Sequence, residues 1–246
     1  METVELLNKL YENLSPSKIN PTVIFNEGWM TRILVEASID EKLEIGGIDF
    51  SKIKSWTSEA LIGSPFVSKK GNKIEKGEGY THADIILGDF KIDYSNRGEI
   101  IMEDNAHILG IIEAKMGSNF SKGTSNAKEG YNQASRNICC LAYYAIKNAP
   151  DCEIFFIIAA PQKKLNKIEE KIKRDLIKDQ ISERYKTSNI TNEDEKEKII
   201  KKVSECNISS ISYEEWIEKI KNQSPKDVSI LKKFYDDCIS YNKIKK

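Results

Sequence analysis

Residues 108–115, ILGIIEAK, are the stretch of sequence that decides the fold. They form a short apolar run that ends in two charged residues, Glu113 and Lys115. On a β-strand, residues two positions apart project from the same face, so these two side chains emerge together while Ile112 and Ala114 point the other way. We therefore expect a carboxylate and an ammonium side by side at the end of a strand that rests on the core.

A second strand candidate precedes this stretch. Residues 82–90, HADIILGDF, place Asp84 directly before the apolar residues Ile85, Ile86 and Leu87. If the two strands pair, the carboxylates of Asp84 and Glu113 converge on one hard cation. Magnesium prefers a few carboxylate oxygens and keeps several waters. The pair of strands therefore predicts a magnesium site.

The other segments predict a mixed α/β domain, with a central sheet and helices packed on it. Asn26 suits the N-cap of a helix, and the all-apolar segment EIFFIIAA suggests a strand buried on both faces. A polar, acidic connection joins residues 90 and 108, a Gly/Lys-rich turn or loop covers 69–79, and the charged stretch 192–205 reads as an exposed helix or an insertion. We expect helices over residues 3–14, 26–41, 131–149 and 162–185, and strands over 56–67, 82–90, 108–115, 153–160 and 207–213.

These residues resemble a known family. The sequence has Asp84 on one strand, a Glu-Ala-Lys sequence with Glu113 and Lys115 on the next apolar strand, and then a helix with Gln133. This order is similar to that of the PD-(D/E)XK nuclease superfamily. Ala83 stands where the motif's name has proline. The resemblance covers about residues 26–217 and implies a restriction-endonuclease-like core within one domain spanning 1–246. An N-terminal helix over 1–20 and a C-terminal helical region over 214–246 lie outside that core.

The resemblance also implies roles. Asp84 and Glu113 would hold Mg²⁺, for which Mn²⁺ would substitute, and Lys115 would orient or deprotonate the attacking water or offset charge on the phosphate. Gln133 would lie near the metal site. A helical glutamate is expected before the first strand, and Glu27 or Glu36 would take that place.

Other polar residues are candidates for substrate contacts. His82 lies two residues before Asp84 and touches substrate phosphate or simply marks the start of the strand. Arg136 and Asn137 share a helical stripe with Gln133 and either reach DNA or form a solvated face. Lys122, in a glycine-containing loop, either clamps a backbone phosphate or belongs to a flexible connector. The lysine-rich run over 163–174 reads better as solvated surface.

Composition narrows the possible classes. The 38 lysines and arginines balance 38 aspartates and glutamates, so the chain does not coat nucleic acid through bulk charge. A nucleic-acid enzyme stays possible, because an acidic metal site cancels basic groups elsewhere. Two histidines argue against a histidine-rich zinc or iron site. Five cysteines without CxxC spacing, an acidic N-terminus and the lack of a long apolar run predict a cytoplasmic protein with reduced thiols and no membrane contact.

The leading interpretation is a Mg²⁺-dependent DNA endonuclease of restriction, phage-defence or mobile-element type, acting on double-stranded DNA and possible as a homodimer. One alternative is a catalytically inactive nucleic-acid-binding or assembly subunit with the same fold. Another is an unrelated metal-dependent hydrolase of nucleotides or other phosphate esters. Target sequence, strandedness and the choice between DNA and RNA stay open.

Overall fold

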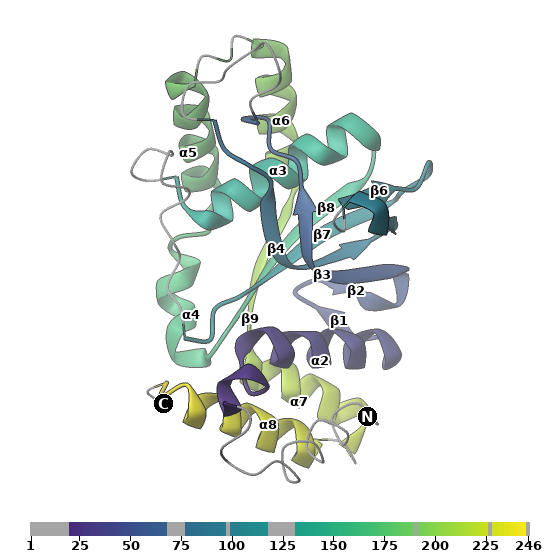
Figure 1. The fold of residues 1–246 in the computed structure, drawn as a ribbon, viewed down its shortest axis with the longest axis vertical. Helices are drawn as coiled ribbons and strands as arrows, with labels where there is room; N and C mark the ends of the chain where they lie inside the picture. The colour runs from purple at the N-terminus through teal and green to yellow at the C-terminus, as the bar shows by residue number, and fades with distance from the viewer. Residues whose placement is uncertain are drawn as a thin grey trace.

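The computed structural model describes residues 20–67, 77–96, 99–117, 131–188, 190, 192–225 and 228–244. Within these ranges the chain builds one sheet of seven strands and a separate two-stranded hairpin, with helices covering both faces of the large sheet (Figure 1). The expected α/β class, a mixed central sheet flanked by helices, is confirmed. The helix expected over 3–14 and most of the loop over 69–79 lie outside the described residues.

The strands of the large sheet follow the order β5-β6-β3-β4-β7-β8-β9. Strand β4 pairs antiparallel with β3 and with β7, whereas β7, β8 and β9 run parallel to one another. The parallel half therefore needs crossover connections, and the helices supply them. The bounds are β3 Ser55–Ile62, β4 Thr81–Gly88, β5 Phe90–Asp93, β6 Glu99–Met102, β7 Ile108–Ala114, β8 Glu153–Ala160 and β9 Asn207–Ser212.

The helices form two layers. Helices α3, α5 and α6 pack on one another on one face of the sheet, and α2, α7 and α8 lie together on the opposite face (Figure 1). Asn26 caps α2 as expected, because its side chain accepts a hydrogen bond from the amide of Trp29. The bounds are α2 Glu27–Asp40, α3 Gln133–Asn148, α4 Gln162–Glu169, α5 Arg174–Thr187, α6 Glu193–Glu205, α7 Tyr213–Gln223 and α8 Val228–Tyr241. Smaller elements are η1 Pro21–Val23, β1 Glu44–Ile45, β2 Ile48–Asp49, η2 Phe50–Lys52 and η3 Tyr94–Asn96.

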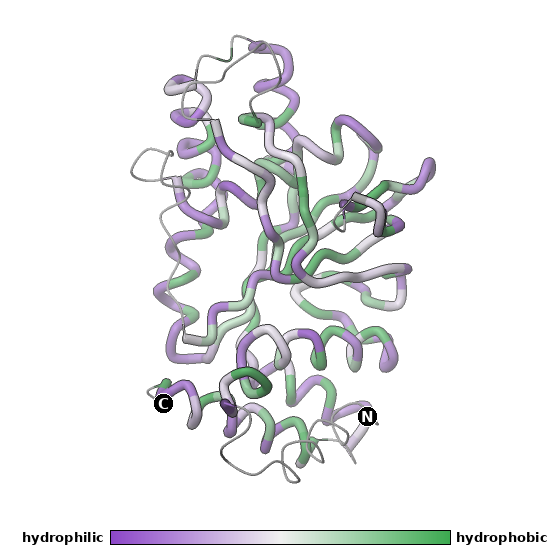
Figure 2. Tube along the Cα trace, viewed as in Figure 1, coloured by the Kyte–Doolittle hydropathy of each residue, from purple (hydrophilic) through white to green (hydrophobic). Residues whose placement is uncertain are grey.

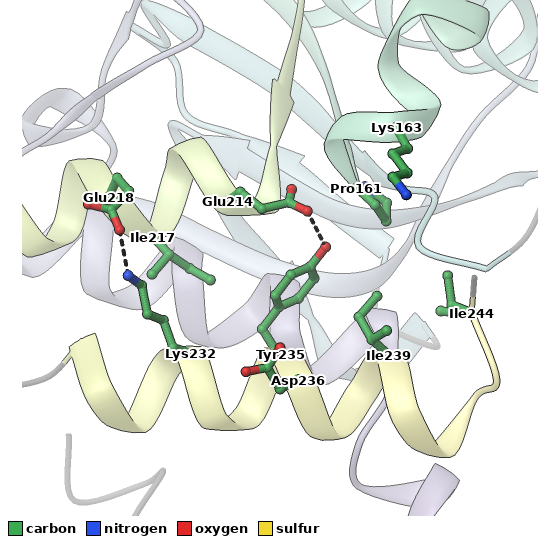
Figure 3. A pocket seen from close by; sticks show the side chains of 10 residues that line it. All are labelled: Pro161, Lys163, Glu214, Ile217, Glu218, Lys232, Tyr235, Asp236, Ile239 and Ile244. Carbon is green, nitrogen blue, oxygen red and sulfur yellow. Dashed lines mark hydrogen bonds and ion pairs between the residues drawn. The ribbon is translucent and has the colours of Figure 1, made fainter. Parts of the chain in front are cut away.

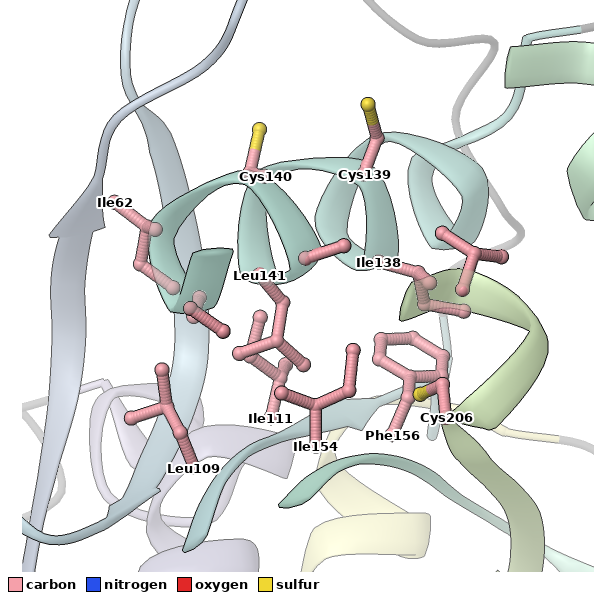
Figure 4. Packing of buried hydrophobic residues seen from close by; sticks show 14 of the residues in the cluster. Ile62, Leu109, Ile111, Ile138, Cys139, Cys140, Leu141, Ile154, Phe156 and Cys206 are labelled. Carbon is pink, nitrogen blue, oxygen red and sulfur yellow. The ribbon is translucent and has the colours of Figure 1, made fainter. Parts of the chain in front are cut away.

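Strands β7 and β8 lie between two hydrophobic clusters, one on each face of the sheet. Every residue of β7 is buried, and so is every residue of β8 after Glu153, which confirms the strand expected at EIFFIIAA. In Figure 4, Ile138 and Leu141 of α3 point toward Ile111 and Phe156 of the sheet, and all four belong to one cluster. Each such burial contributes about 1.5–3 kcal/mol. Apolar residues follow the central strands, whereas polar residues follow the outer helices (Figure 2).

Three expectations were wrong in detail. The helix expected over 162–185 is divided into α4 and α5, because α4 packs near β9 while α5 packs on α3 and α6. The connection expected between residues 90 and 108 contains β5 and β6, whose Phe90 and Ile100 are buried in the sheet. The stretch 192–205 forms a helix, as one of the two alternatives has it, but this helix is not exposed throughout, since α6 buries Ile199 and Val203 against the α3 layer.

The five cysteines are buried free thiols. Within the described ranges, no helix combines the length and the apolar character that a membrane crossing requires.

Gly110 supplies a test of this packing. A Cβ added to Gly110 would lie 2.2 Å from a ring atom of Phe155 on the neighbouring strand. We predict that Gly110→Ala lowers the free energy of unfolding by about 1–3 kcal/mol, as overpacking of a core does. Urea denaturation measures this, and in the Phe155→Leu background the same change should be less harmful. An unchanged urea midpoint in Gly110→Ala would show that β7 and β8 do not meet here as described.

Candidate functional site

Strands β4 and β7 bring Asp84 to the end of β7. Their paired register runs to Ile85 opposite Ile112. Beyond this pair the side chain of Asp84 continues the link, because its Oδ2 accepts a hydrogen bond of 2.8 Å from the backbone amide of Ala114. Asp84 is partly buried. The two strands therefore hold the Asp84 carboxylate against Ala114, the residue between Glu113 and Lys115. This agrees with the expected pairing of the two strands.

The backbone is distorted where Asp84 sits. Ala83 belongs to the cluster on the α3 face and Ile85 to the cluster on the α2 face, although residues two apart on a regular strand share a face. Opposite Asp84 on β3 lies Glu59, whose φ is 58°, a left-handed conformation that non-glycine residues rarely adopt. Strain of this kind often accompanies functional sites.

Glu113 is the most enclosed group of the site, with a relative exposure of 0%. Its Oε1 accepts hydrogen bonds from Lys115 Nζ (2.5 Å) and from Gln133 Nε2, and its Oε2 accepts one from Asn137 Nδ2 (2.8 Å). Asn137 is held in turn, since its Oδ1 accepts a bond of 2.6 Å from Thr81 Oγ1. The first two turns of α3, supported by Thr81 at the start of β4, therefore help to fix both oxygens of this carboxylate.

Electrostatics make Glu113 easy to protonate. Burial and, after it, the neighbouring Asp84 carboxylate raise the pKa of Glu113, the Lys115 ammonium opposes both, and together they bring it from 4.5 to about 8. Two carboxylates this close repel each other, so a proton or a cation between them stabilises the pair.

Lys115 is bound on several sides. Its Nζ donates to Glu113 and to the carbonyl of Ala114 (3.0 Å), and its backbone amide donates to Ala159 O (2.8 Å) on β8. Lys115 as a residue is buried, with a relative exposure of 5%. Glu113 and Lys115 thus lie side by side, as the two-residue spacing on a strand predicts.

Of the two helical glutamates considered, Glu27 lies at this site. It occupies the first position of α2, and its Oε2 accepts hydrogen bonds from the amides of Met116 (2.7 Å) and Gly117 (3.4 Å), just after Lys115. Glu36 is exposed and accepts a hydrogen bond from Trp56 Nε1 (2.7 Å). Of the two glutamates, Glu27 is therefore the one that contacts the segment after Lys115.

The donor set suits a hard cation with few protein ligands. Asp84 and Glu113 offer two carboxylates, and among the described residues no group of three or more histidine, cysteine, aspartate or glutamate side chains is arranged around a metal position. Mg²⁺ commonly takes one or two carboxylates and keeps its remaining positions for waters and substrate phosphate. The residues present therefore fit Mg²⁺ or Mn²⁺ and do not fit a four-ligand structural zinc.

The residues expected to contact substrate lie in different surroundings. His82 is exposed on β4, two residues before Asp84. Asn137 is fully buried against Glu113, so it orients that carboxylate and does not extend to a ligand outside. Arg136 donates through Nε to Glu78 Oε2 (2.7 Å) and through Nη2 to Tyr80 O (3.0 Å). Lys122 lies outside the described residues.

Sequence reasoning missed the partner of Arg136. The Glu78 carboxylate also accepts a hydrogen bond of 3.1 Å from Arg184 Nε, and the side chains of Glu78 and Arg184 are both 0% exposed. The Arg184 guanidinium lies 4.3 Å from the ring centroid of Phe66. This cluster joins α5 to the first turns of α3, which carry Gln133 and Asn137. Glu78 stands in a lysine-rich stretch that reads as a loop, so no local signal marks it as a buried ion.

A cavity of about 380 Å³ lies apart from the charged network, between α4, α7 and α8 (Figure 3). Its edge approaches the site through Ile244, since a Cβ at Gly117 would lie 3.5 Å from Ile244 Cδ1. Asp84, Glu113 and Lys115 do not line this cavity. The candidate site is therefore identified by its group of charged side chains and not by a cavity. The lining residues are Pro161, Lys163, Glu214, Ile217, Glu218, Lys232, Tyr235, Asp236, Ile239 and Ile244.

No protein-family model, curated protein or solved structure matches this chain. The geometry of the site therefore carries the functional assignment.

The buried ion cluster predicts a large effect on stability. We expect Glu78→Ala to lower the free energy of unfolding by about 3–5 kcal/mol, because it leaves two guanidinium groups without their shared carboxylate. Glu103→Ala is the matched control, since Glu103 pairs with Lys54 at the surface and its loss should change stability little. Equal urea midpoints for the two variants would contradict this role of Glu78.

The raised pKa of Glu113 predicts a pH dependence of stability without divalent cations. Between pH of about 4.5 and about 8, the folded chain keeps a proton on Glu113 that the unfolded chain has released. The contribution of this proton to the stability of the folded chain is therefore complete below pH of about 4.5. It is lost as the pH rises through about 8. We expect the wild-type unfolding free energy to fall across this window relative to that of Glu113→Gln. Parallel pH curves for the two proteins would contradict the raised pKa.

Proposed function

We propose that this chain is a Mg²⁺-dependent phosphodiesterase, most specifically a DNA endonuclease. The observation that carries the proposal is the meeting of the Asp84 and Glu113 carboxylates where the pairing of β4 with β7 ends, with the Lys115 ammonium 2.5 Å from Glu113. Two carboxylates beside one lysine match the charges that hydrolysis of a phosphodiester requires.

The order of elements supports the resemblance to the PD-(D/E)XK superfamily and its restriction-endonuclease-like core. Helix α2 carries Glu27, the antiparallel strands β4 and β7 carry Asp84 and the Glu113/Lys115 pair, and α3 carries Gln133 before the parallel strand β8. Each residue of the motif thus stands on the type of element that the resemblance requires. The side chains also converge, which sequence order alone does not ensure.

The roles of the residues follow from their contacts. Asp84 and Glu113 would hold Mg²⁺, with Mn²⁺ as a substitute. The ion would polarise the phosphodiester and lower the pKa of a coordinated water. Gln133 and Asn137 keep Glu113 in one orientation, and Glu27 holds the backbone after Lys115. Lys115 would orient the attacking water or neutralise charge on the phosphate through its ammonium, or would accept a proton from the water as the neutral amine.

Further substrate contacts are proposed from the positions of residues outside the Asp84, Glu113 and Lys115 centre. His82 is exposed two residues before Asp84, where a phosphate of the bound strand would pass. Lys122 keeps its proposed phosphate contact on sequence grounds alone. Cutting both strands of a duplex with one site per chain would favour a two-fold homodimer. Restriction, phage defence and processing of mobile elements are settings in which such an enzyme would act.

A catalytically inactive nucleic-acid-binding or assembly subunit is the second candidate. The observation that favours it is the complete burial of Glu113, whose oxygens already accept three hydrogen bonds from protein side chains. Such a subunit would bind nucleic acid in a salt-sensitive manner but would show no stabilisation by divalent cations.

Cleavage assays separate the two candidates. We predict that the wild-type chain nicks or cuts plasmid DNA with Mg²⁺ or Mn²⁺, and that Asp84→Asn, Glu113→Gln and Lys115→Ala each lower the rate by about 100-fold or more, as loss of a general acid–base group does. Mn²⁺ should raise the melting temperature of the wild type but not that of Asp84→Asn.

Glu36→Gln is the control, because it removes one carboxylate from α2 away from the site. It should cut at the wild-type rate. A Lys115→Ala protein that cuts as fast as wild type would contradict the catalytic assignment, and a wild type that binds DNA without cutting any substrate would favour the inactive subunit.

A further inference from the structure

Lys164 on α4 reaches the segment that follows Lys115. Its Nζ donates a hydrogen bond of 2.9 Å to the carbonyl of Gly117, two residues after Lys115. The amide of the same Gly117 points to Glu27 Oε2 (3.4 Å). The short segment that follows Lys115 is therefore held between α2 and α4, and the Lys164 ammonium lies at its end.

The partners of Lys164 leave it able to bind an anion. An ammonium has three N–H donors, and the hydrogen bond to Gly117 uses one. Among the described residues, no carboxylate lies within ion-pair distance of Lys164 Nζ, whereas Lys147 and Lys196 pair directly with Glu195 and Glu193 (2.8 Å each). Burial lowers the pKa of Lys164, and the nearby charge of Glu27 opposes this shift. A partly desolvated cation without a contacting carboxylate gains stability when an anion arrives.

The neighbourhood distinguishes Lys164 from the other lysines of α4. Lys163 and Lys167 are exposed, and Lys163 extends toward the cavity between α4, α7 and α8 (Figure 3). The N-terminus of α4 is not itself the anion site, because the amide of Gln162 already donates to Glu214 Oε2 (3.0 Å). The anion position therefore belongs to the Lys164 side chain.

We propose that Lys164 binds a backbone phosphate of the nucleic acid, next to the phosphate that lies at Asp84 and Glu113. This inference rests on the proposed function, because it takes the same polyanionic substrate and assigns one more of its contacts. Each strand of a duplex carries regularly spaced phosphates. A strand with one phosphate at Lys115 therefore brings another phosphate near Gly117. Lys164 thus belongs to substrate binding, while Lys115 belongs to the chemical step.

The test compares Lys164→Met with Lys167→Met, which removes the same charge from the same helix at an exposed position. Binding of a short fluorescein-labelled DNA duplex is followed by anisotropy with Ca²⁺, over a series of salt concentrations. We expect Lys164→Met to weaken binding by about tenfold, the effect of losing one charge-assisted hydrogen bond. Its slope of log K against log salt should be smaller by about 0.9, which corresponds to one phosphate contact. Lys164→Arg should restore most of the affinity, and Lys167→Met should bind as the wild type does.

Other outcomes overturn the inference in different ways. Equal losses in Lys164→Met and Lys167→Met mean that α4 acts through general charge. A lower cleavage rate in Lys164→Met with unchanged affinity and salt slope means that Lys164 only positions Gly117. In both cases the proposed function stands. A wild type that neither binds nor cuts DNA overturns the proposed function and this inference together.

Discussion

The carboxylate of Glu113 sets the constraint on which the rest of the site depends. It lies at the end of the central strand β7, with no exposure to solvent. A buried carboxylate is tolerated when donors or cations surround it. Lys115, Gln133 and Asn137 supply those donors. Because two of them stand on α3, the start of that helix must lie close to the end of β7.

The supports of α3 continue this chain of constraints. Its apolar face packs on Ile111 and Phe156 (Figure 4). Its N-terminal region is tied to α5 through the ion cluster of Glu78, Arg136 and Arg184. Apolar packing gives the helix its layer, whereas the ion cluster and the Thr81–Asn137 hydrogen bond direct particular side chains toward Glu113. Glu27 on α2 and Lys164 on α4 hold the segment after Lys115 with individual hydrogen bonds.

Residues close together in sequence account for what could be predicted before the structure was known. The period of a strand places Glu113 beside Lys115, and the apolar run after Asp84 places it on a neighbouring strand. Spacing does not choose between Glu27 and Glu36, because both fit α2 and the choice depends on which end of that helix approaches β7. Glu78 and Arg184 lie 106 residues apart, so their ion pair has no local signature.

Two further features could not be predicted from the sequence: the backbone distortion at Glu59 and the position of Lys164 around its helix. The left-handed backbone of Glu59 arises where β3 and β4 together change faces, and no residue type at that position announces it. Lys164 differs from Lys163 and Lys167 by its phase on a short helix, so a count of basic residues treats the three alike. The elements themselves were largely predictable, but the division between α4 and α5 depends on what each helix packs against.

Anomalous diffraction from a crystal soaked with Mn²⁺ would show whether Asp84 and Glu113 form a metal centre, because it locates the ion without reference to activity. We predict one strong peak that both Asp84 and Glu113 coordinate, at the metal–oxygen distance of about 2.1 Å seen for small divalent cations. We also predict that the peak is absent in Asp84→Asn. Ordered carboxylates with no peak between them, or Mn²⁺ bound only elsewhere, would contradict the claim that these two residues form a metal centre.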